Sequence, residues 1–194
     1  MILPIDIAKN FGTLHREADF DGHKYPVDKG WLCVDGYSCE VEAGDFLWGL
    51  TRYLKPDVVV ETGTYHAFAT ACIALALREN NMGHVWTIEI ESGHEIHNQR
   101  RMVELGLDSW VTLVSGDSLS DDLARLLPGM IDILFVDGGN RAKEHDKYAP
   151  LVSHTGIIMQ HDALKHKYVY DHQQSLGAGF VWGIRGISMI LPKG

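Results

Sequence analysis

Acidic side chains follow three short apolar segments of this chain. Glu61 ends the run VVVE, Glu89 lies near the end of HVWTIEI, and Asp117 follows WVTLVSG. A carboxylate at the end of a strand can accept hydrogen bonds from both hydroxyls of a ribose, or from an exocyclic amine. Taken singly, Glu89 is more simply a solvated strand end, and Asp117 is equally well explained as a helix N-cap. The three together favour a site for a nucleotide-type ligand.

The segment ETGTYHA, residues 61–67, joins the first of these runs to the Ala- and Leu-rich stretch FATACIALALR. A nucleotide-type ligand requires a close approach of the backbone at such a turn, and Gly63 permits it because glycine has no Cβ atom. Thr64 and Tyr65 belong to the same turn and are candidate ligand contacts. Small Ala67 substitutes for a further glycine. The alternative is a tight turn between a strand and a helix that binds nothing.

Two further groups of residues follow later apolar runs. Asp137 comes after IDILFV, and the pair His161 and Asp162 comes after GIIMQ. Aspartate oxygens suit Mg²⁺, which usually keeps several waters as well. A metal bound there would clamp the substrate and lower the pKa of its hydroxyl. The alternative is that Asp137 contacts the amino group of a cofactor or caps the next helix, without a metal.

These residues are positioned by apolar runs that alternate with helical patterns. We expect strands over 58–61, 84–90, 110–114, 131–136 and 156–160, with a closing pair over 180–184 and 186–191. We expect helices over 44–54, 68–78, 94–105 and 142–152, and one more around Leu119, Leu123, Leu126 and Leu127. Strands that alternate with helices form a parallel sheet covered on both faces. The carboxyl ends of its strands share one edge, where open α/β sheets bind ligands.

Composition narrows the function classes. The chain has 26 acidic and 17 basic residues and a formal net charge of −9. This argues against a nucleic-acid partner, because binding to phosphates rests on Lys and Arg. The cysteines Cys33, Cys39 and Cys72 form no CxxC pair and indicate neither a disulfide framework nor a zinc site. No signal peptide or membrane span is recognisable, so we expect a cytoplasmic protein.

The length of 194 residues suits one domain with a full core, and we expect residues 1–194 to form a single domain. Residues 1–50 are expected to supply an N-terminal cap and a helix. Residues 163–180 are expected to form a variable loop that frames the substrate or is simply mobile. Trp182 and Arg185 fall in the closing pair of strands, where a cation–π or packing role is as compatible as recognition.

The order and spacing of four segments resemble a known family. The segments are VVVETGTYHAFAT, TIEIE, GLDSWVTLVSGDS and IDILFVDGG, and with GDFLWGL upstream they cover about residues 40–162. They resemble the class I O-methyltransferases that use S-adenosylmethionine (SAM), in particular the small cation-dependent group of catechol and caffeoyl-CoA methyltransferases. The resemblance implies methyl transfer to the hydroxyl of a small acceptor. It also implies a Rossmann-like, doubly wound α/β sheet of seven mostly parallel strands, with an antiparallel last strand. Relatives are often dimeric, so a homodimer is a further expectation.

The resemblance also implies which residues contact SAM. Glu89 would hold the ribose. Glu61 and Gly63 would line the methionine end, and Asp117 with Ser118 would lie near the adenine. Further candidate contacts of the cofactor are Thr64, Tyr65 and Asp137.

At the acceptor end, the resemblance implies a site for Mg²⁺ or Mn²⁺ formed by Asp137, His161 and Asp162, which would also be the catalytic residues. The family has an aspartate where this chain has His161, a departure that is compatible with another metal, a general base or no metal. Asn140 stands where the family often carries a basic residue, and it cannot act as a base near neutral pH. The candidate substitutes for this base are His66, Lys143, His145 and His161.

Two other functions fit parts of the sequence. Asn140 motivates a SAM-binding protein whose activity is lost or is not methylation. A nicotinamide-dependent oxidoreductase would also use a Rossmann-like sheet, but the chain lacks a full GxGxxG motif.

Overall fold

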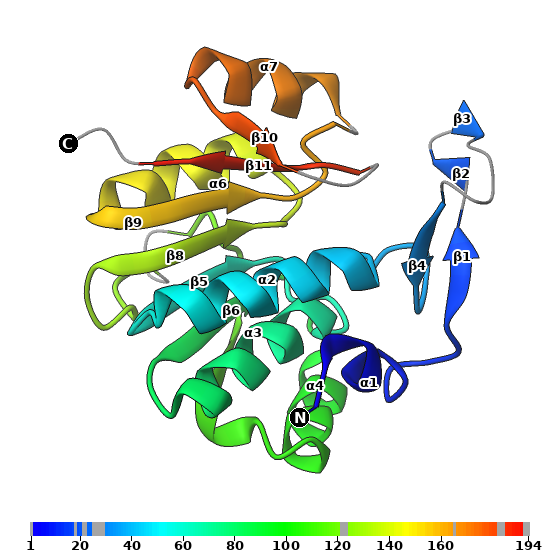
Figure 1. Ribbon diagram of the computed structural model, residues 1–194. Helices are drawn as coiled ribbons and strands as arrows, with labels where there is room; N and C mark the ends of the chain where they lie inside the picture. The colour runs from blue at the N-terminus through cyan, green and yellow to red at the C-terminus, as the bar shows by residue number, and fades with distance from the viewer. Residues whose placement is uncertain are drawn as a thin grey trace.

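Figure 1 shows the computed structural model of the chain, a twisted sheet with helices on both faces and a small β arm at one side. The structure describes residues 2–17, 19–20, 23–24, 30–120, 124–164, 166–181 and 185–191. Within these ranges, no helix combines the length and the apolar character that crossing a membrane requires.

Seven strands form the main sheet in the order β10-β11-β9-β8-β5-β6-β7. Five of them are parallel to one another: β5 (Val58–Thr62), β6 (His84–Glu89), β7 (Val111–Ser115), β8 (Ile131–Val136) and β9 (Val152–Gln160). The last strand, β11 (Ile187–Ile190), runs antiparallel to β9 and pairs on its other side with β10 (Gly179–Val181). The expected fold class is confirmed. The strand order reverses between β5 and β8, and ligands bind at such a switch point in open α/β sheets.

The helices are α1 (Pro4–Ala8), α2 (Val41–Leu54), α3 (Phe68–Asn80), α4 (Glu95–Glu104), α6 (Arg141–Tyr148) and α7 (Lys167–Ser175). In Figure 1, α2 and α3 lie in front of the sheet and α6 lies behind it. Along β8, Ile133 and Phe135 pack into the core on the side of α2 and α3, whereas Leu134 and Val136 pack into the core on the side of α6. Both faces of this strand are buried, which explains its almost continuous apolar sequence.

Helix α3 is buried from Phe68 to Leu77. Its small side chains allow α2 to approach closely, and Gly44 of α2 lies at the contact. A Cβ atom on Gly44 would lie 2.9 Å from Sγ of Cys72 and 3.1 Å from the ring of Phe68. The Ala-rich sequence therefore specifies a helix that lies between two packed layers.

Three elements differ from their expected bounds by four residues or more: β9, α6 and the segment 163–180. β9 begins at Val152 rather than at 156, because α6 ends at Tyr148 and Pro150 lies in a short 3₁₀ turn, Ala149–Leu151. The expected loop 163–180 contains helix α7 instead, and its inner side buries Val169 and Gln173. Leu123, Trp182 and the end of the expected strand 180–184 lie outside the described residues.

The N-terminal region consists of α1 and the β arm. β1 (His15–Glu17) pairs with β4 (Trp31–Cys33), and β2 (Asp19–Phe20) pairs with β3 (His23–Lys24). The chain then returns through residues 34–40 to the carboxyl edge of the sheet, where α2 begins. The last segment of this region, residues 34–40, reaches the site described below.

Candidate active site

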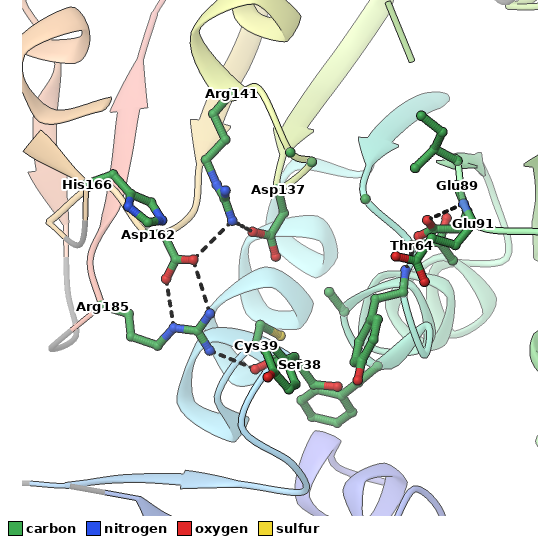
Figure 2. A pocket seen from close by; sticks show the side chains of 18 residues that line it. Ser38, Cys39, Thr64, Glu89, Glu91, Asp137, Arg141, Asp162, His166 and Arg185 are labelled. Atoms are coloured by element: carbon green, nitrogen blue, oxygen red, sulfur yellow. Dashed lines mark hydrogen bonds and ion pairs between the residues drawn. The ribbon is translucent and has the colours of Figure 1, made fainter. Parts of the chain in front are cut away.

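Two adjoining cavities open at the carboxyl edge of the sheet. Cavity A (Figure 2) has a volume of about 340 Å³ and includes Asp137 and Asp162 in its lining, and cavity B has a volume of about 310 Å³ and includes Asp117 and Ser118. These volumes are typical of sites for small molecules. The residues that line both cavities are Gly63, Glu89, Ile90, Gly138 and Gly139.

The turn after β5 lies so close to the loop after β8 that only glycine fits at its centre. Gly63 has a φ of 83°, and a Cβ atom on it would lie 2.5 Å from the carbonyl oxygen of Asp137. Tyr65 and Ala67 also have left-handed backbone conformations, with φ of 46° and 65°. Thr64 and Tyr65 line cavity A, as expected of ligand contacts. The close contact at Gly63 is with the chain's own loop, and the expected approach of a ligand to this turn stays a prediction.

Glu89 stands where the two cavities meet. Its Oε1 accepts a hydrogen bond of 2.9 Å from the backbone N–H of Glu91, and its Oε2 accepts one from the backbone N–H of Tyr65. These two donors hold the carboxylate at the end of β6. Glu89 therefore presents a fixed negative charge to both cavities.

Cavity B contains a carboxylate that the sequence did not single out. Glu144 of α6 accepts hydrogen bonds from the hydroxyls of Ser118 and Thr62, the latter at 3.2 Å. A Cβ atom at Gly138 would lie 2.1 Å from Oε1 of Glu144, so the glycine makes room for this side chain. Asp117 lines the same cavity and accepts a hydrogen bond from the N–H of Leu119. Asp117 is thus both a local cap and available to a ligand.

Glu61 lies behind the turn and lines neither cavity. It is 1% exposed, and one carboxylate oxygen accepts a hydrogen bond from the hydroxyl of Thr70. The other oxygen has no hydrogen-bond partner among the described residues. Burial raises the pKa of this carboxyl to about 8. The structure therefore places Glu61 one layer beneath the cofactor end to which the family resemblance assigned it.

Buried ion pairs form one wall of cavity A, as Figure 2 shows. Nε and Nη2 of Arg185 donate to the two carboxylate oxygens of Asp162 at 2.7 and 3.1 Å, and Nη1 donates to the carbonyl oxygen of Ser38 at 2.7 Å. Nη2 of Arg141 donates to Asp137 at 2.6 Å and to Asp162 at 3.0 Å. The charged side chains of these pairs are at most 14% exposed. The guanidinium group of Arg141 therefore connects the ends of β8 and β9, and that of Arg185 connects the end of β9 to the segment before α2.

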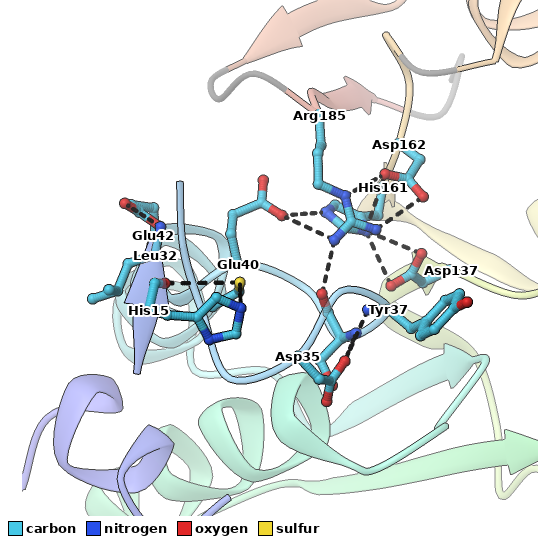
Figure 3. A network of polar contacts seen from close by, with 12 residues as sticks. His15, Leu32, Asp35, Tyr37, Glu40, Glu42, Asp137, His161, Asp162 and Arg185 are labelled. Carbon is cyan, nitrogen blue, oxygen red and sulfur yellow. Dashed lines mark hydrogen bonds and ion pairs between the residues drawn. The ribbon is translucent and has the colours of Figure 1, made fainter. Parts of the chain in front are cut away.

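His161 is fully buried between two carboxylates (Figure 3). Its Nδ1 lies 3.1 Å from both carboxylate oxygens of Asp137, and its Nε2 lies 2.9 Å from Oε2 of Glu40. An ionised carboxylate only accepts hydrogen bonds, so both ring nitrogens donate and the ring is an imidazolium. Burial would lower the pKa of His161, but the charges of Asp137 and Glu40 outweigh it and raise this pKa to about 10. In this arrangement neither nitrogen is available to a metal or to a substrate proton.

The expected metal ligands are brought together, but their charges balance without a metal. The ligand atoms of Asp137, His161 and Asp162 lie within 4.8 Å of one another. The three carboxylates of the network, those of Glu40, Asp137 and Asp162, face three cations, those of His161, Arg141 and Arg185. A divalent cation would have to displace a guanidinium group from each aspartate. The residues present therefore do not fit the metal that the family resemblance implied.

The other candidate bases lie outside both cavities. His66 stacks on Tyr65 with ring centroids 3.8 Å apart, and its Nδ1 lies 3.3 Å from Asp35. The Lys143 side chain is exposed, and His145 is buried on the side of α6 that faces α7. Asn140 is the N-cap of α6 and accepts a hydrogen bond from the N–H of Lys143. None of these side chains lines the cavity that contains Asp137.

Arg141 and Glu40 are important members of the network that the sequence did not reveal. Arg141 had one detectable signal, because it stands one residue after Asn140, where the resembled family often carries a basic residue. Glu40 had none, since its partner His161 is 121 residues away. For Arg185 the sequence left packing, a cation–π contact and recognition open, and the structure makes it the main partner of Asp162.

Comparisons with known proteins agree with this architecture. The family described as a methyltransferase domain has a model that matches residues 60–163. A comparison with curated proteins gave no match.

Several solved structures share the fold. The O-methyltransferase TomG from Streptomyces achromogenes, in complex with SAM, has a TM-score of 0.69 and 20% identity over 83% of this chain and 84% of that chain. An O-methyltransferase from Bacillus cereus, in complex with SAH, has a TM-score of 0.69 and 16% identity over 81% and 84% of the two chains. A methyltransferase from Geobacter sulfurreducens has a TM-score of 0.65 and 23% identity over 76% of each chain.

Proposed function

The chain belongs to the methyltransferase domain family, and from this premise we propose that it binds SAM across cavities A and B and methylates an oxygen atom of a small acceptor. The position of Glu89 carries the proposal. It is a fixed carboxylate at the carboxyl edge of the sheet, with one cavity on either side. A ribose held there would direct its base into one cavity and its other substituent into the second.

The two cavities differ in the groups that they offer to such a ligand. Asp117 and Ser118 in cavity B are the groups for the adenine, whereas Thr64 and Tyr65 in cavity A are the groups for the methionine end. Gly63 and Gly138 line both cavities and place no side chain between them and the ligand. When bound, SAM would supply a sulfonium methyl carbon to which the acceptor oxygen bonds in line while the C–S bond breaks and S-adenosylhomocysteine leaves, a reaction that depends mainly on positioning.

Asp137 and Arg141 are the residues that would act on the acceptor. Burial would raise the pKa of Asp137, but the charges of His161 and Arg141 outweigh it and keep this pKa below its ordinary value. Asp137 is therefore ionised and would accept a hydrogen bond from the acceptor's hydroxyl, orient it, and take its proton as the new O–C bond forms. Arg141 lies 2.6 Å from Asp137 and would stabilise the negative charge that develops on the oxygen. Because a carboxylate of low pKa is a weak base, hydroxyls that ionise readily should react fastest.

Calorimetry with SAM tests the cofactor site. Glu89→Gln should weaken SAM binding by about 10- to 100-fold, since each hydrogen bond to a charged group contributes about 1.5–3 kcal/mol. Glu104→Gln is a matched control, because Glu104 lies on the exposed side of α4, away from both cavities. Absence of SAM binding to the native protein at millimolar concentration would refute the proposal. Displacement of SAM by NADH would favour the oxidoreductase instead.

Transfer of labelled methyl groups to a panel of phenols, catechols and sugars tests the reaction. With an acceptor from this panel, Asp137→Asn should lower turnover by about 100-fold or more, the usual range for a group that handles a proton in the transition state. SAM binding measured in parallel should change much less. Equal turnover by Asp137→Asn and the native protein would exclude the role given to Asp137.

A further inference from the structure

A second group of metal-ligating side chains lies between α6 and α7, outside cavities A and B. It consists of His145 and Asp146 on α6 and His172 on α7. Oδ1 of Asp146 lies 3.3 Å from Nδ1 of His145 and 3.1 Å from Nε2 of His172. The ligand atoms of all three residues lie within 4.8 Å of one another. We call these three residues the α6–α7 cluster.

The spacing of the α6–α7 cluster is close to that of a coordination shell. Two ligand atoms that are each about 2.1 Å from a tetrahedral ion lie about 3.4 Å from each other. The two distances from Asp146, 3.3 and 3.1 Å, are near this value. The imidazole rings stand 5.1 Å apart, nearly perpendicular at 79°, so both can direct a nitrogen toward the carboxylate. Small side-chain adjustments would suffice to place an ion among the three.

The cluster combines a buried histidine with an exposed carboxylate. His145 is 5% exposed, and its Nε2 has no hydrogen-bond partner among the described residues. The side chain of Asp146 is 65% exposed, which gives an ion access from solvent. Two imidazole nitrogens and one carboxylate oxygen suit Zn²⁺ and its neighbours better than Mg²⁺.

We propose that His145, Asp146 and His172 bind one divalent transition-metal ion of the Zn²⁺ type, with solvent completing its coordination. This site is separate from the proposed methyl transfer and does not depend on it. The ion would nonetheless act on cavity A. Arg141 and His166 line that cavity. His145 lies one helical turn after Arg141 on α6, and α7 begins directly after His166. An ion that joins α6 to α7 would therefore hold two walls of cavity A together.

Titration of the metal-free, tag-free protein tests the site. We expect one Co²⁺ per chain with a visible absorption band, displaced by Zn²⁺, and a rise in melting temperature on binding. His172→Gln and Asp146→Asn should each weaken binding more than about tenfold, since even residues behind the ligands contribute about 10- to 100-fold. His94→Gln is the matched control. His94 also pairs with a carboxylate, Glu91, at 3.0 Å, but belongs to no such cluster among the described residues.

Three results would overturn the site. The first is no saturable binding of Co²⁺ or Zn²⁺ up to millimolar concentration, in which case the cluster is held by hydrogen bonds alone. The second is binding that survives both His172→Gln and Asp146→Asn. The third is an equal loss of binding in His94→Gln. Both site variants change side chains that are at least 20% exposed, so folding should be retained, and circular dichroism checks this.

Discussion

Nε2 of His161 lies 2.9 Å from Oε2 of Glu40, although 121 positions separate the two residues. Glu40 directly precedes α2, and His161 directly follows β9. The pair therefore joins the N-terminal segment to the carboxyl edge of the sheet. Tyr37 and Ser38, shortly before Glu40 in this segment, line cavity A. Burial would raise the pKa of Glu40, but the charge on His161 outweighs it and lowers this pKa.

Glu40→Gln should lower the free energy of unfolding by about 3 kcal/mol at pH 7. The reason is that breaking one side of a buried ion pair leaves the other charge without compensation. Urea denaturation measures the change. Glu104→Gln, at an exposed ion pair on α4, should change stability by less than about 0.5 kcal/mol. A similar small effect of both substitutions would show that the Glu40–His161 pair contributes little.

Gly63→Ala should destabilise the protein by about 2 kcal/mol or more and weaken SAM binding. Its Cβ atom would collide with the carbonyl oxygen of Asp137, and its φ of 83° strains any residue with a side chain. Ala67→Gly provides the comparison in the same turn, because Ala67 already has a left-handed φ of 65°. That change should stay within about 1 kcal/mol of the native stability. Equal effects of the two substitutions in thermal and urea unfolding would contradict the close contact.

Glu61→Gln should change how stability depends on pH. Burial raises the pKa of Glu61 from 4.5 to about 8, so the folded state holds this proton more tightly than the unfolded state does. The corresponding stability is complete below about pH 4.5 and is lost as the pH rises toward about 8. Gln cannot ionise but still offers an oxygen to Thr70. The variant should therefore gain stability relative to the native protein between pH 5 and 8. Urea denaturation curves with a constant difference across this window would disprove the shift.

Mg²⁺ should neither bind at Asp137 nor raise the rate of methyl transfer. Arg141 and Arg185 already neutralise Asp137 and Asp162, and both nitrogens of His161 are engaged. Calorimetry with Mg²⁺ at about 10 mM measures binding. The transfer assay with and without Mg²⁺ measures the effect on the rate. A saturable Mg²⁺ site that disappears in Asp137→Asn would contradict this prediction and restore the metal implied by the family resemblance.

Helix α7 shows where local sequence patterns stop being informative. Its sequence KYVYDHQQS has few apolar residues. The helix buries two side chains, Val169 and the polar Gln173. No apolar periodicity indicates a helix there. Gln173 is buried because it hydrogen-bonds to Gln160 of β9 and accepts a hydrogen bond from Ser188 of β11. Those partners are adjacent only once the sheet has formed. In contrast, β8 was predictable to the residue, because its apolar run is itself the consequence of burial on both faces.

The sequence by itself determined the five parallel strands with helices α2, α3, α4 and α6, the glycine turn at Gly63, and the gathering of Glu89, Asp117 and Asp137 at one edge. These follow from local periodicity, and from the rule that parallel strands end on the same side of a sheet. Only the tertiary structure decided what the acidic residues pair with. Arg141 and Arg185 reach Asp162, and Glu40 reaches His161, from elements that are distant in the sequence. Ion pairs of this kind leave no periodic trace in a sequence, because charge acts through space rather than along the chain.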